Sequence, residues 1–338
     1  MLDSQASPRA IVAALDEYVI GQEEAKRIVA VAVYAHFRKV ARTRGTGAPI
    51  TKSNVLLIGP SGTGKTLLCE TLAKVLDVPF ATAEATSIAQ ARFVNDEIDA
   101  ILERLIERAG GDLERAGRGI VFIDEIDKLK APAGQPRSVS GESVQHALLK
   151  IMEGAQVKLD NGRYLDTTHM LFICGGAFVG LDEIRSLSHN YGFIATMRGE
   201  NQKILDRLNA RVKPTDLFTF GLIPEFTGRL PIIARFSELD RDKLVRIMTE
   251  PKDSIHAQMR EIFANESVEL VVARRVFEQI ADLALEYKTG ARSLRGIFEE
   301  LVTPVLFVVP DDRTIERVEI DSLFAEPRLV RRAARSAD

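Results

Sequence analysis

The stretch GPSGTGKT, residues 59–66, constrains the fold of this chain more than any other feature. It matches the pattern G-x-x-x-x-G-K-[ST] at every fixed position, follows the apolar run NVLLI and precedes the helical pattern LLCETLAKVL. Its glycines allow backbone N–H groups to turn inward around a phosphate, and the helix N-terminus adds its positive dipole end. The strand–loop–helix setting therefore predicts a phosphate-binding loop, with an ordinary glycine-rich turn as the alternative.

We expect this segment to bind the phosphates of a nucleotide together with Mg²⁺. In such loops the lysine, here Lys65, reaches the β- and γ-phosphates, and the hydroxyl of the next residue, Thr66, ligates Mg²⁺. The nucleotide-binding residues expected from this segment are Pro60, Ser61, Gly62, Thr63, Gly64, Lys65, Thr66 and Leu67.

A second motif, GIVFIDEIDK, lies some 60 residues further along the chain. Its apolar run ends in Asp124 and Glu125, and a strand beside the phosphate loop would bring both carboxylates to the edge of the sheet where ligands bind. We expect Asp124 to hold the water shell of Mg²⁺ and Glu125 to orient and polarise the attacking water. Taken alone, the motif would more often be a strand that ends in solvated acids.

The order of patterns predicts an α/β fold with a parallel sheet in the large domain, followed by a small, mostly helical domain. Four apolar runs that suit strands buried on both faces (NVLLIG, VPFATAEA, GIVFIDE, HMLFICGG) alternate with helical patterns. The expected parts are an N-terminal helical segment (1–50), a large α/β domain (51–234), a small helical domain with short strands (235–325) and a flexible basic tail (326–338).

Composition narrows the classes of protein. The net charge of −3, the absence of Trp and an aromatic content of 6% argue against a nucleic-acid partner. No apolar run approaches the length of a membrane helix, and the N-terminus lacks a signal-peptide pattern. The two cysteines, Cys69 and Cys174, suggest a reducing compartment, and the five histidines lack metal-ligand spacing. We expect a cytoplasmic protein without a membrane or nucleic-acid partner.

Together with these motifs, several long strings resemble the ClpX family of AAA+ unfoldases, which feed proteins to the ClpP peptidase. They are GQEEAKRIVAVAVYAHFRK, VSGESVQHALLKIMEG, LFICGGAFVGL, FGLIPEFTGRLPIIA and KTGARSLRGI, and the resemblance runs from about Val19 to Ile320. It implies an AAA+ P-loop NTPase that forms a homo-hexameric ring, with ATP between the large and small domains and against the neighbouring subunit.

The resemblance also assigns roles to single residues. It implies that Val19 and Ile20 pack against adenine, that Arg229 is an arginine finger reaching the neighbouring subunit's γ-phosphate, and that Arg292 is the sensor 2 arginine. Planar guanidinium groups suit phosphate oxygens. Without the resemblance, each arginine would more often be an ordinary surface residue. Where many AAA+ proteins carry a polar sensor, this chain has Cys174, as ClpX does, and we assign none.

The segment QARFVNDEID aligns with a pore loop of the family that reads Gly-Tyr-Val-Gly. The alignment places Phe93 on the aromatic residue that grips substrate, Val94 on its apolar neighbour and Arg92 beside it. Arg92 and Asn95 replace both glycines, which restricts the backbone, and phenylalanine lacks the tyrosine hydroxyl. The alternative is that Phe93 is a buried anchor for the following helix.

Three further departures concern partners. The family begins with a four-cysteine zinc domain, whereas this sequence starts at the ATPase module, either as a piece or because it lacks that domain; we expect no zinc. The segment KLDNGRYLDTTH lacks the basic cluster of the family's pore-entrance loop. The peptidase-docking tripeptide, aliphatic-Gly-Phe in the family, corresponds to Tyr191, Gly192 and Phe193. A tyrosine is bulkier and more polar than the expected aliphatic residue.

Three functions are consistent with these features. The first is an ATP-driven unfoldase that pulls protein substrates through the pore of a ring and delivers them to a ClpP-type peptidase. The second is a stand-alone remodelling chaperone that never hands substrate over. The third is a nucleic-acid motor on the same AAA+ core, which the charge and aromatic content disfavour.

Overall fold

The computed structural model describes residues 6–43, 52–130, 139–159, 162–189 and 211–332. The chain divides into two compact units. The first comprises Met1–Ala13, Glu23–Pro60 and Lys65–Phe236, and the second comprises Ala14–Gln22, Ser61–Gly64 and Ser237–Asp338. Helix α1 (Pro8–Asp16) therefore contributes residues to both units, as does the phosphate loop.

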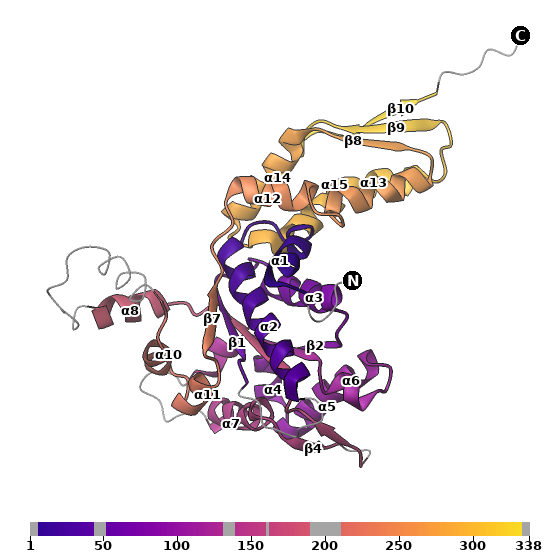
Figure 1. The fold of residues 1–338 in the computed structure, drawn as a ribbon. Helices are drawn as coiled ribbons and strands as arrows, with labels where there is room; N and C mark the ends of the chain where they lie inside the picture. Colours follow the sequence, from indigo (N-terminus) through magenta and orange to yellow (C-terminus); the bar gives the residue numbers. More distant parts are fainter. Residues whose placement is uncertain (1–5, 44–51, 131–138, 160–161, 190–210, 333–338) are drawn as a thin grey trace, which may run out of the picture. The chain divides into compact units, whose positions relative to one another are not determined.

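The first unit is built on a five-stranded parallel sheet in the order β2-β3-β6-β1-β7, with helices on its faces (Figure 1). Its strands are β1 (Val55–Ile58), β2 (Phe80–Glu84), β3 (Ile120–Asp124), β6 (Leu171–Gly176) and β7 (Ile232–Arg235). Every residue of β1 and β6 is buried, as continuous apolar runs require when helices cover both faces. The α/β fold predicted from the sequence is confirmed.

One long helix precedes β1, further helices fill the connections between the strands, and a short hairpin adds two strands. The helices are α2 (Glu23–Thr43), α3 (Lys65–Leu76), α4 (Ala85–Gln90), α5 (Val94–Arg108), α6 (Leu113–Ala116), the 3₁₀ helix η1 (Ile126–Leu129), α7 (Val139–Glu153), α8 (Leu181–His189), α10 (Pro214–Phe220) and α11 (Pro224–Gly228). The hairpin consists of β4 (Gln156–Lys158) and β5 (Tyr164–Asp166).

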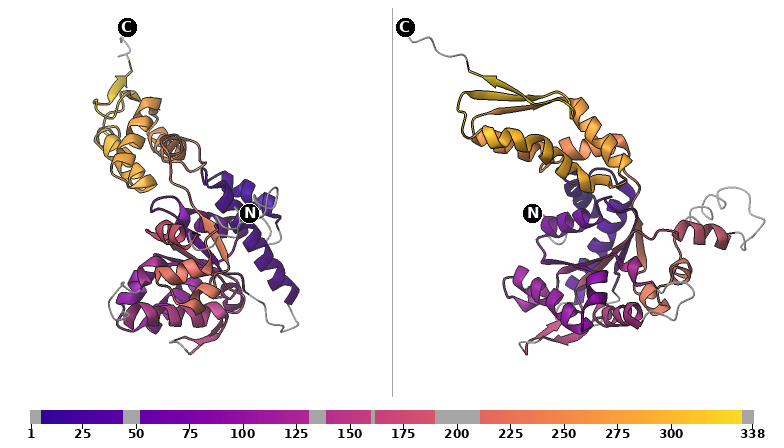
Figure 2. Two further views of the ribbon diagram at one scale, coloured as in Figure 1. Left: turned by 90° about the vertical axis from the view of Figure 1, so that its left-hand side faces the viewer. Right: turned by 180° about the vertical axis from the view of Figure 1, so that it is seen from behind.

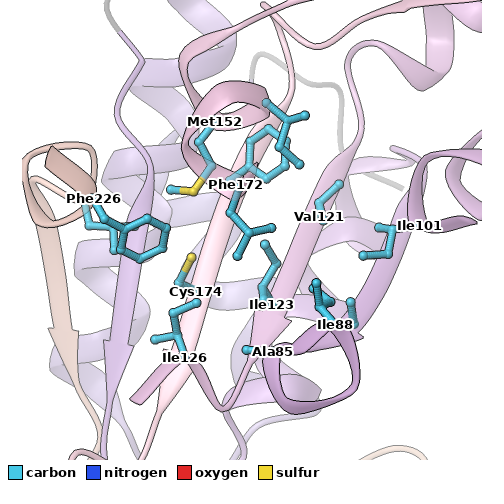
Figure 3. Packing of buried hydrophobic residues seen from close by; sticks show 14 of the residues in the cluster. Ala85, Ile88, Ile101, Val121, Ile123, Ile126, Met152, Phe172, Cys174 and Phe226 are labelled. Atoms are coloured by element: carbon cyan, nitrogen blue, oxygen red, sulfur yellow. The ribbon is translucent and has the colours of Figure 1, made fainter. Parts of the chain in front are cut away.

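One face of the sheet carries the larger core. Figure 3 shows Val121 of β3 and Phe172 of β6 in one cluster with Ile88 of α4, Ile101 of α5 and Met152 of α7. These side chains are fully or almost fully buried, and dense packing of this kind fixes the strands from which the loops emerge. The register pairs Glu84 with Asp124 and Ile58 with Gly176, so the carboxyl ends of β1, β2, β3 and β6 meet at one edge.

The second unit is mostly helical and carries a three-stranded sheet in the order β10-β9-β8, seen in the right-hand view of Figure 2. Its elements are α12 (Arg241–Thr249), α13 (Ile255–Asn265), β8 (Glu269–Val272), α14 (Arg274–Glu286), the 3₁₀ helix η2 (Gly290–Ser293), α15 (Leu294–Val308), β9 (Ile315–Ile320) and β10 (Arg328–Arg331). Phe277 and Phe298 stack in its core with ring centroids 5.8 Å apart.

The structure differs from the sequence expectation at the C-terminus. Residues 326–338 were expected to form a flexible tail, yet Arg328–Arg331 forms β10, which pairs antiparallel with β9. Arg328 and Arg331 make ion pairs with Glu319 and Asp312, so the basic residues of this segment stabilise the strand pairing. Among the described residues, no helix is long and apolar enough to span a bilayer.

Candidate active site

The phosphate loop leaves β1 through a tightly packed glycine. The Gly59 N–H donates to the Gly176 carbonyl over 3.1 Å, and a Cβ on Gly59 would lie 2.6 Å from the backbone oxygen of Phe236. Only glycine fits this approach of two backbones. Lys65 is buried at the start of α3, where Nζ donates to the carbonyls of Gly59 (2.7 Å) and Pro60 (2.9 Å). The predicted phosphate-binding lysine is thus held against its own loop.

The tip of the loop, Ser61–Gly64, lies in the second unit. Gly62 and Gly64 have φ angles of 75° and 93°, which favour glycine because other residues are strained there. The Gly62 carbonyl accepts a hydrogen bond from the Ala291 N–H over 3.1 Å. Within this unit the turn that carries Arg292 therefore lies beside the loop tip. Arg292 itself is exposed.

Gln22 is a buried polar residue that the sequence analysis did not single out. Its amide nitrogen donates to the carbonyls of Thr63 (3.4 Å) and Ser237 (2.9 Å), and its amide oxygen accepts from the Ser237 N–H (2.9 Å). Gln22 thereby connects the loop tip to Ser237 within the second unit. Its own backbone is left-handed, with a φ angle of 59°. Val19 and Ile20, just upstream, are buried in the same unit.

Two carboxylates stand at the end of β3, as predicted. The Thr66 hydroxyl donates to Asp124 Oδ2 over 3.3 Å, so the two expected Mg²⁺ ligands adjoin each other across α3 and β3. Asp124 Oδ1 accepts from the Glu125 N–H over 2.8 Å. Glu125 has a left-handed backbone (φ 58°, ψ 31°), a conformation that non-glycine residues rarely adopt.

Two further polar residues at this edge were not predicted. The Thr86 hydroxyl, on α4, donates to Glu125 Oε2 over 3.2 Å. Asp127, buried on η1, accepts from the N–H groups of Ala177 (3.3 Å) and Phe178 (3.2 Å) and so holds the loop that follows β6. Their hydrogen-bond partners lie 39 to 51 residues away in the sequence, so no local pattern identifies Thr86 or Asp127.

Arg229 caps α11 on the first unit and is about half exposed. Its Nη2 lies 2.6 Å from Glu153 Oε1, at the last residue of α7. Glu153 was likewise not predicted, although it belongs to one of the strings that carry the family resemblance.

Phe93 directly precedes α5, and 57% of its surface is exposed. The alternative of a buried helix anchor is therefore wrong. The Arg92 guanidinium lies 5.4 Å from the centroid of the Phe93 ring, and Val94 packs partly against the core. The loop thus presents a cation and an aromatic ring together. The expected docking tripeptide Tyr191-Gly192-Phe193 lies outside the described residues.

The two thiols are buried in the core beside this edge. Burial raises the pKa of Cys174 to about 12, and burial together with the nearby Asp124 carboxylate raises that of Cys69 well above its usual value. Both are therefore held as neutral thiols and cannot act as nucleophiles.

The remaining predicted residues lie in the phosphate loop and at the start of α3. Ser61 and Leu67 are exposed, whereas Thr63 is buried.

Taken together, the first unit offers an inward lysine, a hydroxyl beside a carboxylate, and a second carboxylate held by a hydroxyl. Hard oxygen ligands of this kind suit Mg²⁺, which retains waters and phosphate oxygens as its other ligands. The chemistry that such a set supports is phosphoryl transfer to water.

Comparison with known proteins gives matches along most of the chain. Residues 50–233 match the AAA domain (Cdc48 subfamily), and residues 239–320 match the C-terminal, D2-small domain of ClpB protein. The ATP-dependent Clp protease ATP-binding subunit ClpX 3 of Methylococcus capsulatus is 43% identical, over 93% of this chain and 79% of the relative. The ClpX subunit of Treponema denticola is 45% identical, over 90% of this chain and 77% of the relative. The ClpX subunit of Porphyromonas gingivalis is 41% identical, over 93% of this chain and 80% of the relative.

Proposed function

Since this chain belongs to the ClpX family of AAA+ ATPases, we propose that it is an ATP-driven protein unfoldase and translocase. In this proposal six copies form a ring that pulls protein substrates through its pore and delivers them to a ClpP-type peptidase. The observation that carries the ATPase chemistry is the meeting of Thr66, Asp124 and Glu125 at the carboxyl edge of the sheet.

ATP binding falls to the phosphate loop and its neighbours. Lys65 exchanges its contacts with loop carbonyls for phosphate oxygens, and Thr66 and Asp124 hold Mg²⁺, directly or through water. When bound, Mg²⁺ neutralises charge on the phosphates. The resemblance adds Val19 and Ile20 at adenine and Arg292 as a further phosphate contact. We infer that 51–234 and 235–325 act as the large and small domains of one subunit.

Hydrolysis requires a water molecule held in line with the γ-phosphate. Glu125 accepts a hydrogen bond from that water and polarises it, while Thr86 fixes the orientation of the carboxylate. Arg229 of the adjacent subunit stabilises the charge that develops on the phosphate oxygens. Each site is then complete only inside a ring.

Substrate contact falls to the loop that contains Arg92, Phe93 and Val94. An exposed aromatic ring at the start of a helix has no packing role, and this supports a role in gripping a polypeptide. Phenylalanine provides a flat apolar surface for such a grip. The guanidinium of Arg92 adds positive charge beside it.

We infer a cytoplasmic location and peptidase docking through Tyr191, Gly192 and Phe193. Six docking loops on one ring bind multivalently, so a weak single contact still gives tight association. The stand-alone chaperone is the second candidate, because tyrosine departs from the family's aliphatic residue at the first position of the tripeptide.

ATP-dependent unfolding of a tagged, stable fluorescent protein tests the proposal. We expect loss of native fluorescence with ATP, none with the Lys65→Ala variant, and peptide products only when a ClpP-type peptidase is added. Absence of any ATP-dependent unfolding would contradict the proposal. Unfolding without handover to a generic or a cognate peptidase, unchanged by Phe193→Ala, would favour the stand-alone chaperone.

A further inference from the structure

The ion pair between Arg229 and Glu153 joins two helices of the first unit. Arg229 follows α11 and Glu153 ends α7. Arg229 Nη2 lies 2.6 Å from Glu153 Oε1, and the exposed fraction is 53% for the Arg229 side chain and 41% for the Glu153 side chain. A carboxylate at a helix C-terminus faces the negative end of the helix dipole. Glu153 therefore does not stabilise its own helix, and its favourable contact is with Arg229.

The end of α7 is a fixed support for this carboxylate. The Ile151 carbonyl accepts hydrogen bonds from Lys52 Nζ (3.3 Å) and from the Thr167 hydroxyl (2.9 Å), and the Met152 carbonyl accepts one from the Asn54 amide (3.4 Å). These bonds satisfy carbonyls that the last turn of a helix otherwise leaves free. Glu153 consequently projects from an anchored turn and not from a fraying end.

The start of α11 is attached to the same helix. Gln145, buried in α7, accepts a hydrogen bond from the N–H of Ile223, the residue before α11, over 2.9 Å. Its amide nitrogen donates to the Leu129 carbonyl (3.2 Å), four residues past Glu125. Helix α11 is thus held to α7 at both ends, at its start by a buried hydrogen bond and at its finish by the exposed Glu153–Arg229 pair.

The two attachments differ in how readily they break. A buried hydrogen bond is costly to lose, whereas an ion pair between half-exposed groups is weak and opens easily. The Arg229 nitrogen that faces Glu153, Nη2, is one of the donors with which a guanidinium grips a phosphate in bidentate fashion. The carboxylate and the phosphate therefore compete for one group.

We propose that Glu153 is a positioning residue that holds Arg229 against its own subunit until the neighbouring subunit presents a γ-phosphate. The proposal rests on the proposed function, in which Arg229 acts across the subunit boundary. Glu153 then restrains hydrolysis in the adjacent site, and release of Arg229 is one of the steps that precede it.

Steady-state ATPase kinetics of the full chain test this role. Glu153→Gln keeps the shape of the side chain and removes the charge, and we expect kcat to rise about two- to fivefold, the range that a half-exposed ion pair supports, while KM stays within about twofold. Glu153→Asp retains the carboxylate and should restore the wild-type kcat. In an Arg229→Ala background, Glu153→Gln should add nothing.

Glu103 supplies the matched control. It pairs with Arg163 at 3.3 Å with similar exposure, on a different part of the same unit, so Glu103→Gln should leave kcat unchanged. If Glu153→Gln behaves like Glu103→Gln while Arg229→Ala still abolishes hydrolysis, the inference is wrong and the arginine finger stands. A lower kcat with a lower melting temperature would make Glu153 a structural residue and would also overturn it. Normal hydrolysis by Arg229→Ala would instead remove the finger itself from the proposed function.

Discussion

The Thr86 hydroxyl donates a hydrogen bond to Glu125 Oε2 over 3.2 Å, from the first turn of α4 to the residue that follows β3. Glu125 occupies a left-handed backbone conformation, so both its main chain and its carboxylate are constrained. In the proposed mechanism that carboxylate orients the attacking water, so we expect Thr86 to control the catalytic geometry through its hydrogen bond to Glu125.

Replacement of Thr86 by valine should therefore slow hydrolysis. Valine has nearly the same shape and lacks the donor, and a hydrogen bond to a charged group contributes about 1.5–3 kcal/mol, so we expect kcat to fall on the order of tenfold or more. Thr86→Ser keeps the hydroxyl and should stay close to wild type. Equal kcat values for the valine and serine variants in a coupled ATPase assay would exclude this role.

Substitution of Glu125 by glutamine should separate binding from hydrolysis. The amide keeps the shape of the side chain and loses the charge that polarises water, so ATP remains bound while kcat falls by on the order of 10²–10⁴. Lys65→Ala should instead weaken nucleotide binding itself. Fluorescent nucleotide titration beside single-turnover hydrolysis distinguishes the two, and normal turnover by Glu125→Gln would show that another group positions the water.

Much of this site follows from local sequence patterns, and the rest depends on contacts that no local pattern reveals. Strands β1, β3 and β6 are apolar runs that end in glycines or acids, so their ends and the roles expected for Asp124 could be predicted. Strand β7 (Ile232–Arg235) follows a proline and ends in an arginine, so its sequence lacks the glycine or acid that marks the ends of the other strands. Strand β10 is rich in arginine, and its ion pairs with Glu319 of β9 and with Asp312 before that strand are contacts that the local pattern does not reveal.

The residues missed in the site share one property. Thr86, Gln22 and Glu153 each act through a partner 39 or more residues away, and each side chain alone is unremarkable. Phe93 is a different case, because the family resemblance singled it out and only the structure decided between exposure and a buried helix anchor.

Replacement of Phe93 by alanine should remove unfolding and preserve the ATPase. The side chain is 57% exposed, so stability should change by no more than about 0.5 kcal/mol. Phe218→Ala, at a side chain that is 50% exposed on α10, is the matched control and should unfold substrate normally. Unfolding rates measured at saturating ATP decide the point. A Phe93→Ala protein that unfolds substrate as fast as the control would rule out the grip.

Acid should destabilise the first unit through His36. Burial, aided by the charge of Lys52 and opposed by the hydrogen bond to the His169 carbonyl, lowers the pKa of His36 from 6.5 to about 4. The unfolded chain therefore binds a proton between pH 6.5 and 4 that the folded chain does not, so stability falls as the pH drops through this window, by at most about 3 kcal/mol. Urea unfolding at several pH values should show a shallower decline for His36→Gln. An identical pH profile for both proteins would contradict this assignment.

The central claim is that the neighbouring subunit completes each catalytic site. The most direct test is the ATPase activity of rings mixed from two inactive variants. Glu125→Gln subunits lack the group that positions water and retain Arg229, whereas Arg229→Ala subunits retain Glu125 and lack the finger. Each alone should be inactive, with the loss of Arg229 costing on the order of 10³–10⁵ in rate. In an equal mixture, with subunit exchange checked by affinity capture of a tagged variant, about a quarter of the sites regain both groups, and ATPase activity should return accordingly. A mixture no more active than either variant alone would contradict the account.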